Sequence, residues 1–234
     1  MRCSAPPSPP PTRPMKRETP VTGGRFITLE GGEGAGKTTQ LSRLAQALAP
    51  LVPEVVTTRE PGGSPGAEAI RGLLVAGGAE RWDPRGEALL HAAARRDHLL
   101  RTVWPALARG AWVVCDRFAD STSAYQGGGH GLPQDELDAL HAFVCGGFQP
   151  DLTVIFDLPV AVGLARAGRR GGGEDRYERM DPAFHQRLFD RYHAIASAFP
   201  ERCRLIEADG AIEAVHARLW AVVLERFPEL TERR

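Results

Sequence analysis

Residues 31–38 read Gly-Gly-Glu-Gly-Ala-Gly-Lys-Thr and match the phosphate-binding pattern GxxxxGK[ST]. The apolar run FITL precedes this loop, and a segment with helical periodicity follows it. In this strand–loop–helix context the glycines let backbone N–H groups converge on phosphate oxygens, and the helix N-terminus adds positive potential. A glycine-rich turn without a ligand is the alternative. The motif predicts a nucleoside triphosphate site made of Gly31, Gly32, Glu33, Gly34, Ala35, Gly36, Lys37, Thr38 and Thr39.

Short apolar runs alternate with helical patterns along the rest of the chain. The apolar runs predict strands at residues 25–30, 54–58, 112–116, 152–157 and 204–207. Helical patterns occupy residues 37–49, 85–109, 134–144 and 182–199. The strand runs lack a polar face, which is typical of strands covered on both sides. We therefore expect a single α/β domain with a parallel sheet, whose ligands bind beyond the carboxyl ends of the strands.

Composition excludes several classes of function. The 234 residues are 42% hydrophobic and 25% charged, which is typical of a globular domain. Lys+Arg and Asp+Glu both total 29, so the chain lacks the overall positive charge that drives nucleic-acid binding. The four cysteines lie far apart, which argues against a disulfide scaffold or a zinc site. No apolar stretch approaches the roughly 18 residues of a membrane span. A soluble, cytoplasmic protein is expected.

The first 22 residues differ from the rest, since they hold seven of the 19 prolines. This composition favours an extended, solvated chain and provides no apolar core of a signal peptide. We predict a disordered extension over residues 1–22 and one domain over residues 23–230. A misplaced start codon would also account for this stretch, and a functional recognition arm is the alternative.

Two aspartates end predicted strands and are candidates for a Mg²⁺ site. Asp116 is followed at once by Arg117, which places a carboxylate for the metal beside a guanidinium that can clamp a phosphate. The hydroxyl of Thr38 is the second predicted metal ligand. Asp157 is followed by Leu158-Pro159, so we predict that it caps the next helix instead.

Further polar residues indicate a second site that binds a phosphate-bearing ligand. Arg59 follows the second strand, Arg71 lies on the helix beyond, and Arg95 lies on an alanine-rich helix where a solvated role is equally compatible with the pattern. Within residues 120–129, Gln126 is suited to read the edge of a base, although a flexible Gly/Ser loop is the alternative.

The most basic part of the domain surrounds Gly171-Gly172-Gly173. Glycine-hinged, arginine-rich sequence of this kind suits a lid, here about residues 166–180, that closes over a transferring phosphate and excludes water. A solvated charged loop is the alternative.

Taken together, these motifs resemble the thymidylate kinase family. The matching segments are FITLEGGEGAGKTTQ, TREPGGSPGAEAIRGLLV, EALLHAAARRDH, DRFADSTSAYQGGG and PDLTVIFDLP, within residues 25–228. The resemblance implies a P-loop nucleoside-monophosphate-kinase-like fold with a five-stranded parallel sheet in the order 2-3-1-4-5. It also implies Mg²⁺-dependent transfer of the γ-phosphoryl group of ATP to dTMP, giving dTDP and ADP for dTTP biosynthesis, in a homodimer.

The same resemblance implies a role for each matching residue. Lys37 and Thr38 would hold ATP phosphates and Mg²⁺, and Asp116 would position the metal and the acceptor. A catalytic arginine is expected from the lid, with Arg169 or Arg170 favoured and Arg166 a further candidate. The expected dTMP site consists of Glu33, Arg59, Glu60, Arg71, His91, Arg95, Arg117, Ser121, Thr122, Tyr125 and Gln126.

Residue 91 departs from the family pattern, which has Phe or Tyr stacking on thymine at this position. His91 offers a smaller ring whose ordinary pKa lies near neutrality, so we expect weaker or pH-sensitive thymine binding. The sequence leaves two alternative functions open. The chain could be a kinase for another acceptor such as dUMP, or a non-catalytic nucleotide switch.

Overall fold

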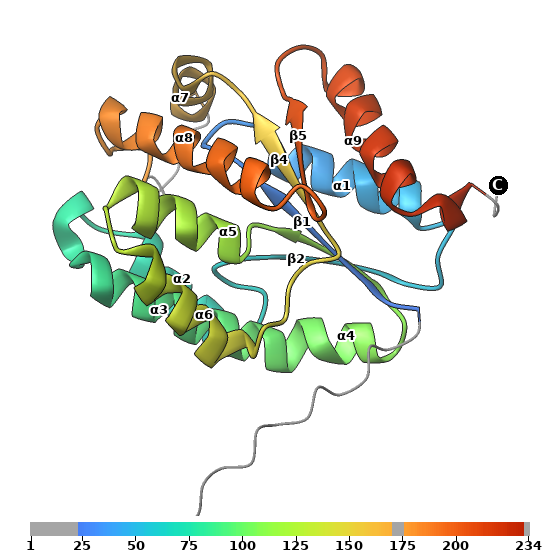
Figure 1. The fold of residues 1–234 in the computed structure, drawn as a ribbon, viewed down its shortest axis with the longest axis horizontal. Coiled ribbons are helices and arrows are strands. Elements are labelled where there is room, and N and C mark those ends of the chain that lie inside the picture. The colour runs from blue at the N-terminus through green and yellow to red at the C-terminus, as the bar shows by residue number, and fades with distance from the viewer. Residues whose placement is uncertain (1–22, 170–175, 232–234) are drawn as a thin grey trace, which may run out of the picture.

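Five parallel strands form the centre of the molecule in a computed structural model that describes residues 23–169 and 176–231. Their order is β2-β3-β1-β4-β5, which confirms the predicted sheet (Figure 1). The strands are β1 (Arg25–Glu30), β2 (Val55–Arg59), β3 (Trp112–Asp116), β4 (Leu152–Asp157) and β5 (Cys203–Glu207). In the register of the sheet, Leu29 of β1 and Arg59 of β2 both lie beside Asp116 of β3. The carboxyl ends of these strands therefore meet at one edge.

Helices cover both faces of the sheet (Figure 1). The α-helices are α1 (Lys37–Leu48), α2 (Pro65–Val75), α3 (Pro84–His98), α4 (Trp104–Ala108), α5 (Ala119–Thr122), α6 (Gln134–Cys145), α7 (Val160–Gly168), α8 (Pro182–Ala198) and α9 (Ile212–Arg226). Two π-helical segments are η2 (Leu99–Val103) and η3 (Ser123–Gly129), and two 3₁₀ turns are η1 (Ala79–Arg81) and η4 (Pro228–Leu230). None of the described helices is long and apolar enough to cross a membrane.

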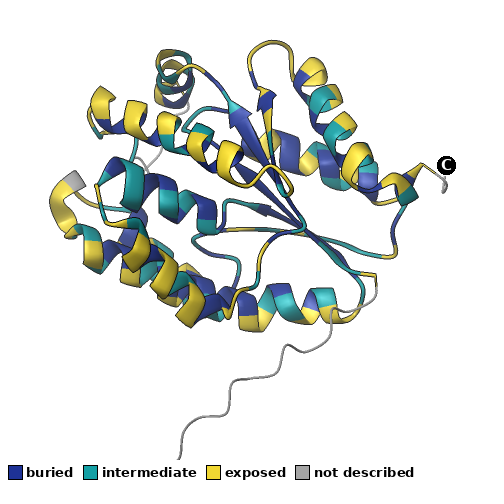
Figure 2. Cartoon of the chain, viewed as in Figure 1, coloured by how far each residue is buried: buried dark blue, intermediate teal, exposed yellow. Residues whose placement is uncertain are grey.

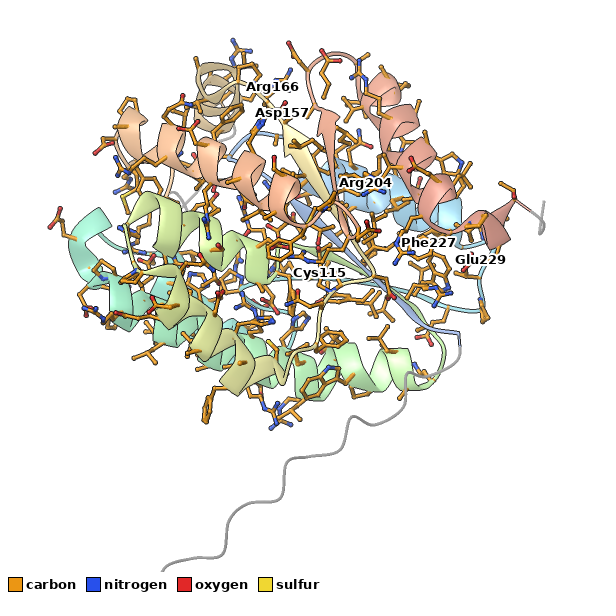
Figure 3. The ribbon with its side chains drawn as sticks, in the orientation of Figure 1. Cys115, Asp157, Arg166, Arg204, Phe227 and Glu229 are labelled. Atoms are coloured by element: carbon orange, nitrogen blue, oxygen red, sulfur yellow. The ribbon has the colours of Figure 1, made fainter. Side chains whose placement is uncertain are left out.

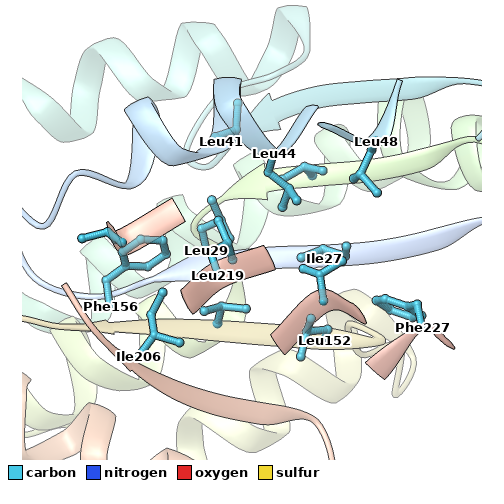
Figure 4. Close-up of a cluster of buried hydrophobic side chains, with 14 of the residues drawn as sticks. Ile27, Leu29, Leu41, Leu44, Leu48, Leu152, Phe156, Ile206, Leu219 and Phe227 are labelled. Carbon is cyan, nitrogen blue, oxygen red and sulfur yellow. The ribbon is translucent and has the colours of Figure 1, made fainter. Parts of the chain in front are cut away.

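Buried residues lie along the central strands and on the helix sides that face them (Figure 2). The two faces of the sheet bury different kinds of side chain. Alternate residues of the strands point to opposite faces. On one face, Ile27 and Leu29 join leucines of α1 and α9 in an entirely apolar cluster (Figure 4). On the other face, the apolar clusters under α3, α6 and α8 adjoin buried charged residues, among them Glu30, Glu60, Glu87, Arg95 and Arg176.

Most predicted elements are present, with two kinds of difference. Strand β2 ends one residue later than expected, and the predicted helix 85–109 is a continuous run of α3, η2 and α4. The polar run at residues 120–129 is helical rather than a flexible loop: it forms α5 and η3, and η3 packs against both α5 and α8.

The capping role expected for Asp157 is wrong. Pro159 occupies the N-cap position of α7, without a side-chain cap. The Asp157 carboxylate instead accepts a hydrogen bond at Oδ1 from Nε2 of His193, 3.0 Å away. Figure 3 labels Asp157 at the end of β4 and Arg166 on the neighbouring helix α7. The predicted N-terminal extension lies outside the described residues, as do Arg170 and the glycines of the predicted lid.

Candidate active site

The glycine-rich loop joins β1 to α1 and leaves the helix N-terminus open. Gly36 occupies the N-cap position with φ 84°, a left-handed conformation that favours glycine, and no side chain caps the helix. The first N–H groups of α1 therefore remain free to bind an anion.

Helix α7, which was expected after Asp157 but without bounds, packs closely on this loop. A Cβ atom at Gly34 would overlap the carbonyl oxygen of Gly163 on α7. Conversely, a Cβ atom at Gly163 would lie 2.5 Å from the carbonyl oxygen of Glu33. Glycine at both positions lets the loop and the helix touch backbone to backbone, which fixes the shape of the loop. The small residues of VAVGLARAG were the only signal of this contact in the sequence.

Lys37 bends back over the loop. Its Nζ donates to the carbonyl oxygens of Gly31 at 3.1 Å and Gly32 at 2.8 Å. Burial, with a contribution from the charge of Arg117, lowers the pKa of Lys37 to about 8. Bound phosphate would provide the compensating negative charge that this buried ammonium group lacks.

The two predicted metal ligands lie in direct contact. Thr38 Oγ1 donates to Asp116 Oδ2 at 2.8 Å. The second carboxylate oxygen, Oδ1, is buried and has no hydrogen-bond partner among the described residues. An orphaned carboxylate oxygen beside a threonine hydroxyl suits Mg²⁺, which prefers oxygen ligands and keeps part of its water shell. The described residues hold no cluster of three or more His, Cys, Asp or Glu side chains that would form a complete metal cage.

A cavity of about 120 Å³ opens beside the loop. It brings together side chains from β1–α1, α3, the end of β3 and η3, which lie far apart in the sequence. Ten of the eleven predicted acceptor residues line it: Glu33, Glu60, Arg71, His91, Arg95, Arg117, Ser121, Thr122, Tyr125 and Gln126. Arg59 is absent from this lining and pairs with Glu68, with its NH2 group 3.1 Å from Oε2.

Arg117 is held at the mouth of the cavity from several sides. Its φ of 71° is left-handed, which is costly for a residue other than glycine and fixes the turn that follows β3. Its NH2 group donates to Glu33 Oε1 at 3.0 Å, and Tyr125 donates to the same oxygen at 2.6 Å. Burial alone would raise the pKa of Glu33, but the charges of Arg117 and Lys37 outweigh this effect and lower it to about 2.

Arg95 is buried rather than solvated. Its Nε donates to Glu60 Oε2 at 2.8 Å, and its NH2 group donates to Thr122 Oγ1 at 2.9 Å. His98 lies 2.9 Å from the other oxygen of Glu60. Burial would raise the pKa of Glu60, yet the charge of Arg95 and the contact with His98 lower it. A guanidinium with only 4% of its residue surface exposed is thus preorganised in the cavity wall.

His91 does not titrate near neutrality, which corrects the prediction of pH-sensitive base binding through this residue. Burial lowers the pKa of His91 to about 4. Its Nε2 lies 2.9 Å from the hydroxyl of Tyr177, another residue of the cavity wall. The imidazole is therefore neutral over the physiological range.

The predicted lid is only partly described. Arg169, at the C-terminal end of α7, is exposed, and Arg166 pairs with Asp209 at 2.6 Å. Arg176 is fully buried against Glu87 of α3, with 2.5 Å between its NH2 group and Oε2.

Sequence reasoning missed Glu30 and Glu87, which support the site from below. Glu30 accepts hydrogen bonds from the Phe118 N–H at 2.7 Å and the Ser121 hydroxyl at 2.5 Å. Ser121 in turn accepts a hydrogen bond from Arg117. Glu87 accepts a hydrogen bond from Gln126. Carboxylates within otherwise apolar runs, as in FITLE and EALL, were the available signal.

Comparison with known proteins gives a consistent result. A family model described as "Thymidylate kinase" matches residues 29–219. A thymidylate kinase of Caulobacter vibrioides is 55% identical over 207 residues, which cover 88% of this chain and 99% of the relative. A thymidylate kinase of Rhizorhabdus wittichii is 52% identical over 206 residues, with 88% of this chain and 99% of the relative covered.

A solved structure agrees with these sequence matches. The crystal structure of thymidylate kinase from Ehrlichia chaffeensis superposes with a TM-score of 0.69 at 35% sequence identity. The match covers 86% of this chain and 99% of the other.

Proposed function

The chain belongs to the thymidylate kinase family, and on this premise we propose which residues carry out its reaction. The family assignment confirms the resemblance seen in the sequence. The chain is a phosphotransferase that moves the γ-phosphoryl group of ATP to dTMP, giving dTDP and ADP for dTTP biosynthesis. The alternatives, a kinase for another acceptor and a non-catalytic switch, are not favoured.

The observation that carries the site assignment is the cavity between the glycine-rich loop and α3. Arg95 and Arg117 both line it, so two guanidinium groups suited to bind a phosphate border the same space. Gln126 and Thr122 also line this space and are the proposed contacts of the thymine base. The carboxylate of Glu33, which is ionised, is the proposed acceptor for the sugar 3′-hydroxyl.

ATP and Mg²⁺ are the proposed partners of the loop. We assign the ATP phosphates to N–H groups within residues 31–39 and to Lys37, since no side chain caps α1 and Lys37 Nζ donates to loop carbonyl oxygens. Thr38 and Asp116 would hold Mg²⁺, which neutralises charge on the phosphates when bound.

The remaining work of the protein is positioning. Phosphoryl transfer needs in-line placement of donor and acceptor and stabilisation of charge on the equatorial oxygens. Lys37 and Arg117 converge between the two proposed sites, since both donate to the carbonyl oxygen of Gly31. The proposed lid, about residues 166–180, would supply a further arginine, of which Arg169 is described and exposed.

We also propose that the chain forms a homodimer through α3 and α6. Large apolar side chains are exposed on α3 (Leu89, 59%) and on α6 (Phe143, 88%), and also on η2, which continues α3 (Leu100, 50%). Helices α3 and α6 pack side by side, joined by Arg85–Glu136 at 2.7 Å. Covering such side chains with a second copy would remove apolar area from water. The cytoplasm is the proposed location.

A coupled ADP-release assay tests the acceptor site. We expect turnover with dTMP to exceed turnover with dCMP and dGMP by several orders of magnitude. Arg117→Ala should lower kcat/KM for dTMP roughly a hundredfold or more, because it removes a charge-assisted contact to the acceptor phosphate. The exposed Arg43, which pairs with Glu213 on the far side of α1, provides the matched control Arg43→Ala. Wild-type rates in Arg117→Ala would contradict the site assignment.

A further inference from the structure

Glu87 is a buried charge that the proposed reaction does not use. It lies on α3 with none of its side chain exposed. Its carboxylate contacts Nε2 of Gln126 at 2.6 Å, NH2 of Arg176 at 2.5 Å and Nε2 of His130 at 3.4 Å, and it also pairs with the hydroxyl of Tyr177. Of these partners, Gln126 and Tyr177 line the proposed dTMP cavity, whereas Glu87 itself does not.

The carboxylate of Glu87 stays ionised. Burial alone would raise its pKa, but the hydrogen bond from His130, the charge of Arg176 and the contact with Gln126 lower the pKa to about 2. An ionised carboxylate has no proton to give, so it can only accept hydrogen bonds. Whatever faces Glu87 must therefore be a donor.

This requirement fixes which way the amide of Gln126 points. A side-chain amide has a donor end and an acceptor end, and rotation by half a turn exchanges them. If Gln126 were turned around, its Oε1 would lie against an oxygen of Glu87, two acceptors in contact without a proton between them. The NH2 group consequently faces Glu87, and the carbonyl oxygen of the amide points away from it.

The carbonyl end of Gln126 has no partner within the described part of the chain. Oε1 is buried and forms no hydrogen bond there, although the whole residue is only 1% exposed. A buried acceptor without a partner is costly, and a ligand that donates to it repays this cost. Thymine and uracil carry a donor at N3, whereas cytosine carries an acceptor there.

We propose that Glu87, held in place by Arg176, is a positioning residue that fixes the amide of Gln126 so that the site accepts only bases that donate a proton at N3. The inference rests on the proposed dTMP site. It places the origin of base discrimination in a residue that never touches the substrate.

Arg176 makes this arrangement rigid. Its Nε donates to the carbonyl oxygen of Gly78 at 3.1 Å, and its NH1 group donates to that of Leu74 at 3.3 Å. These carbonyl groups lie at and just beyond the C-terminal end of α2, so the guanidinium is anchored on backbone. Arg176 thereby holds the carboxylate of Glu87 in place. Glu87 in turn holds the amide of Gln126 in one orientation.

The substitution Glu87→Gln tests the proposal, because glutamine can donate as well as accept and no longer dictates the orientation of Gln126. The readout is the ratio of kcat/KM for dTMP to kcat/KM for 5-methyl-dCMP, which has the shape of dTMP but an acceptor at N3. We expect this ratio to fall by about tenfold or more, the effect of one lost hydrogen-bond discrimination.

Two further variants separate positioning from general destabilisation. Asp120→Asn removes the charge of another buried carboxylate that pairs with an arginine, Arg202 at 2.6 Å, and should leave the ratio unchanged. Gln126→Leu removes the whole side-chain amide, both its donor NH2 and its acceptor oxygen. Adding Glu87→Gln to this variant should therefore produce no further change in the ratio. If Glu87→Gln alone fails to fold, Glu87→Gln with Arg176→Met removes both buried charges together and provides the same readout.

The outcomes are distinct. An equal loss of kcat/KM for both nucleotides in Glu87→Gln, with an unchanged ratio, would overturn the inference and leave the kinase assignment intact. Failure of the wild-type chain to phosphorylate dTMP would overturn the proposed function and this inference with it. The proposal is supported if Glu87→Gln lowers the ratio in the parent chain but does not change it when Gln126 is already leucine.

Discussion

The two faces of the sheet solve different problems. The face covered by α1 and α9 buries a cluster made up of leucine, isoleucine, valine, alanine and aromatic side chains. The face covered by α3, α5 and α8 buries carboxylates and guanidinium groups, such as Glu60 with Arg95 and Glu87 with Arg176. Apolar burial stabilises a fold, whereas a buried ion pair roughly balances its own desolvation cost.

The difference indicates a division of labour. Burial of side chains on the apolar face stabilises the fold. On the polar face, burial of charged groups costs free energy but holds those groups in fixed positions around a cavity. Substitutions on the polar face and its loop should therefore change activity more than stability. Substitutions on the apolar face should change stability more than activity.

The largest expected effect on activity comes from Lys37→Ala. Loss of the ammonium group from the phosphate loop should lower kcat roughly a thousandfold or more. The melting temperature should stay the same or rise slightly, because burial already destabilises the charged form of Lys37, as its lowered pKa shows. Steady-state kinetics and thermal melting check both statements. A large fall in melting temperature would show that Lys37 supports the fold rather than the reaction.

The largest expected effect on stability alone comes from Leu219→Ala on α9. Leu219 is fully buried in the apolar cluster, so its truncation should lower the free energy of unfolding by about 3 kcal/mol. Urea denaturation measures this change, and kcat/KM for dTMP should stay within about twofold of the parent value, since distant sites are usually independent. Ile212→Ala, at a half-exposed position of the same helix, is the matched control. Comparable losses of activity and stability in Leu219→Ala would contradict the division between the faces.

A smaller effect, on pH dependence, is expected from Glu30→Gln. Burial, together with the charge of Asp120, raises the pKa of Glu30 from 4.5 to about 7. Between these values the folded chain holds a proton that the unfolded chain has lost, so the contribution of Glu30 to stability falls as pH rises, by up to about 1 kcal/mol per pH unit. Glutamine removes this slope. The free energy of unfolding of Glu30→Gln minus that of the parent should therefore increase from pH 5 to pH 7.

The comparison with the parent is necessary because another group titrates over the same range. The pKa of His91 falls from 6.5 to about 4 on folding, so its contribution to stability rises with pH there and opposes that of Glu30. The difference between the two unfolding curves removes the contribution of His91. Parallel curves for Glu30→Gln and the parent would show that Glu30 is already ionised in the folded protein.

Local patterns were sufficient to predict the frame of the site. The glycine spacing of residues 31–38, the apolar runs before them and the Asp116-Arg117 pair after β3 each depend on neighbours within a few residues. The strand order, by contrast, came from resemblance to a family. Helix α9 was missed, and α2 and α7 were expected after β2 and β4 without bounds. The packing of η3 on α8 gave a helix where the Gly/Ser composition also allowed a loop.

The sequence by itself determined that this chain binds a nucleotide on a glycine-rich loop within an α/β domain, because those properties follow from backbone conformation and hydrophobic periodicity. Tertiary structure alone decided the electrostatics of the cavity. It turned Arg95 from a solvated candidate into a buried partner of Glu60, kept His91 neutral, and placed Glu87 beneath Gln126. Charge, pKa and amide orientation depend on which groups are neighbours after folding and on how much water folding removes, and neither is encoded in local sequence.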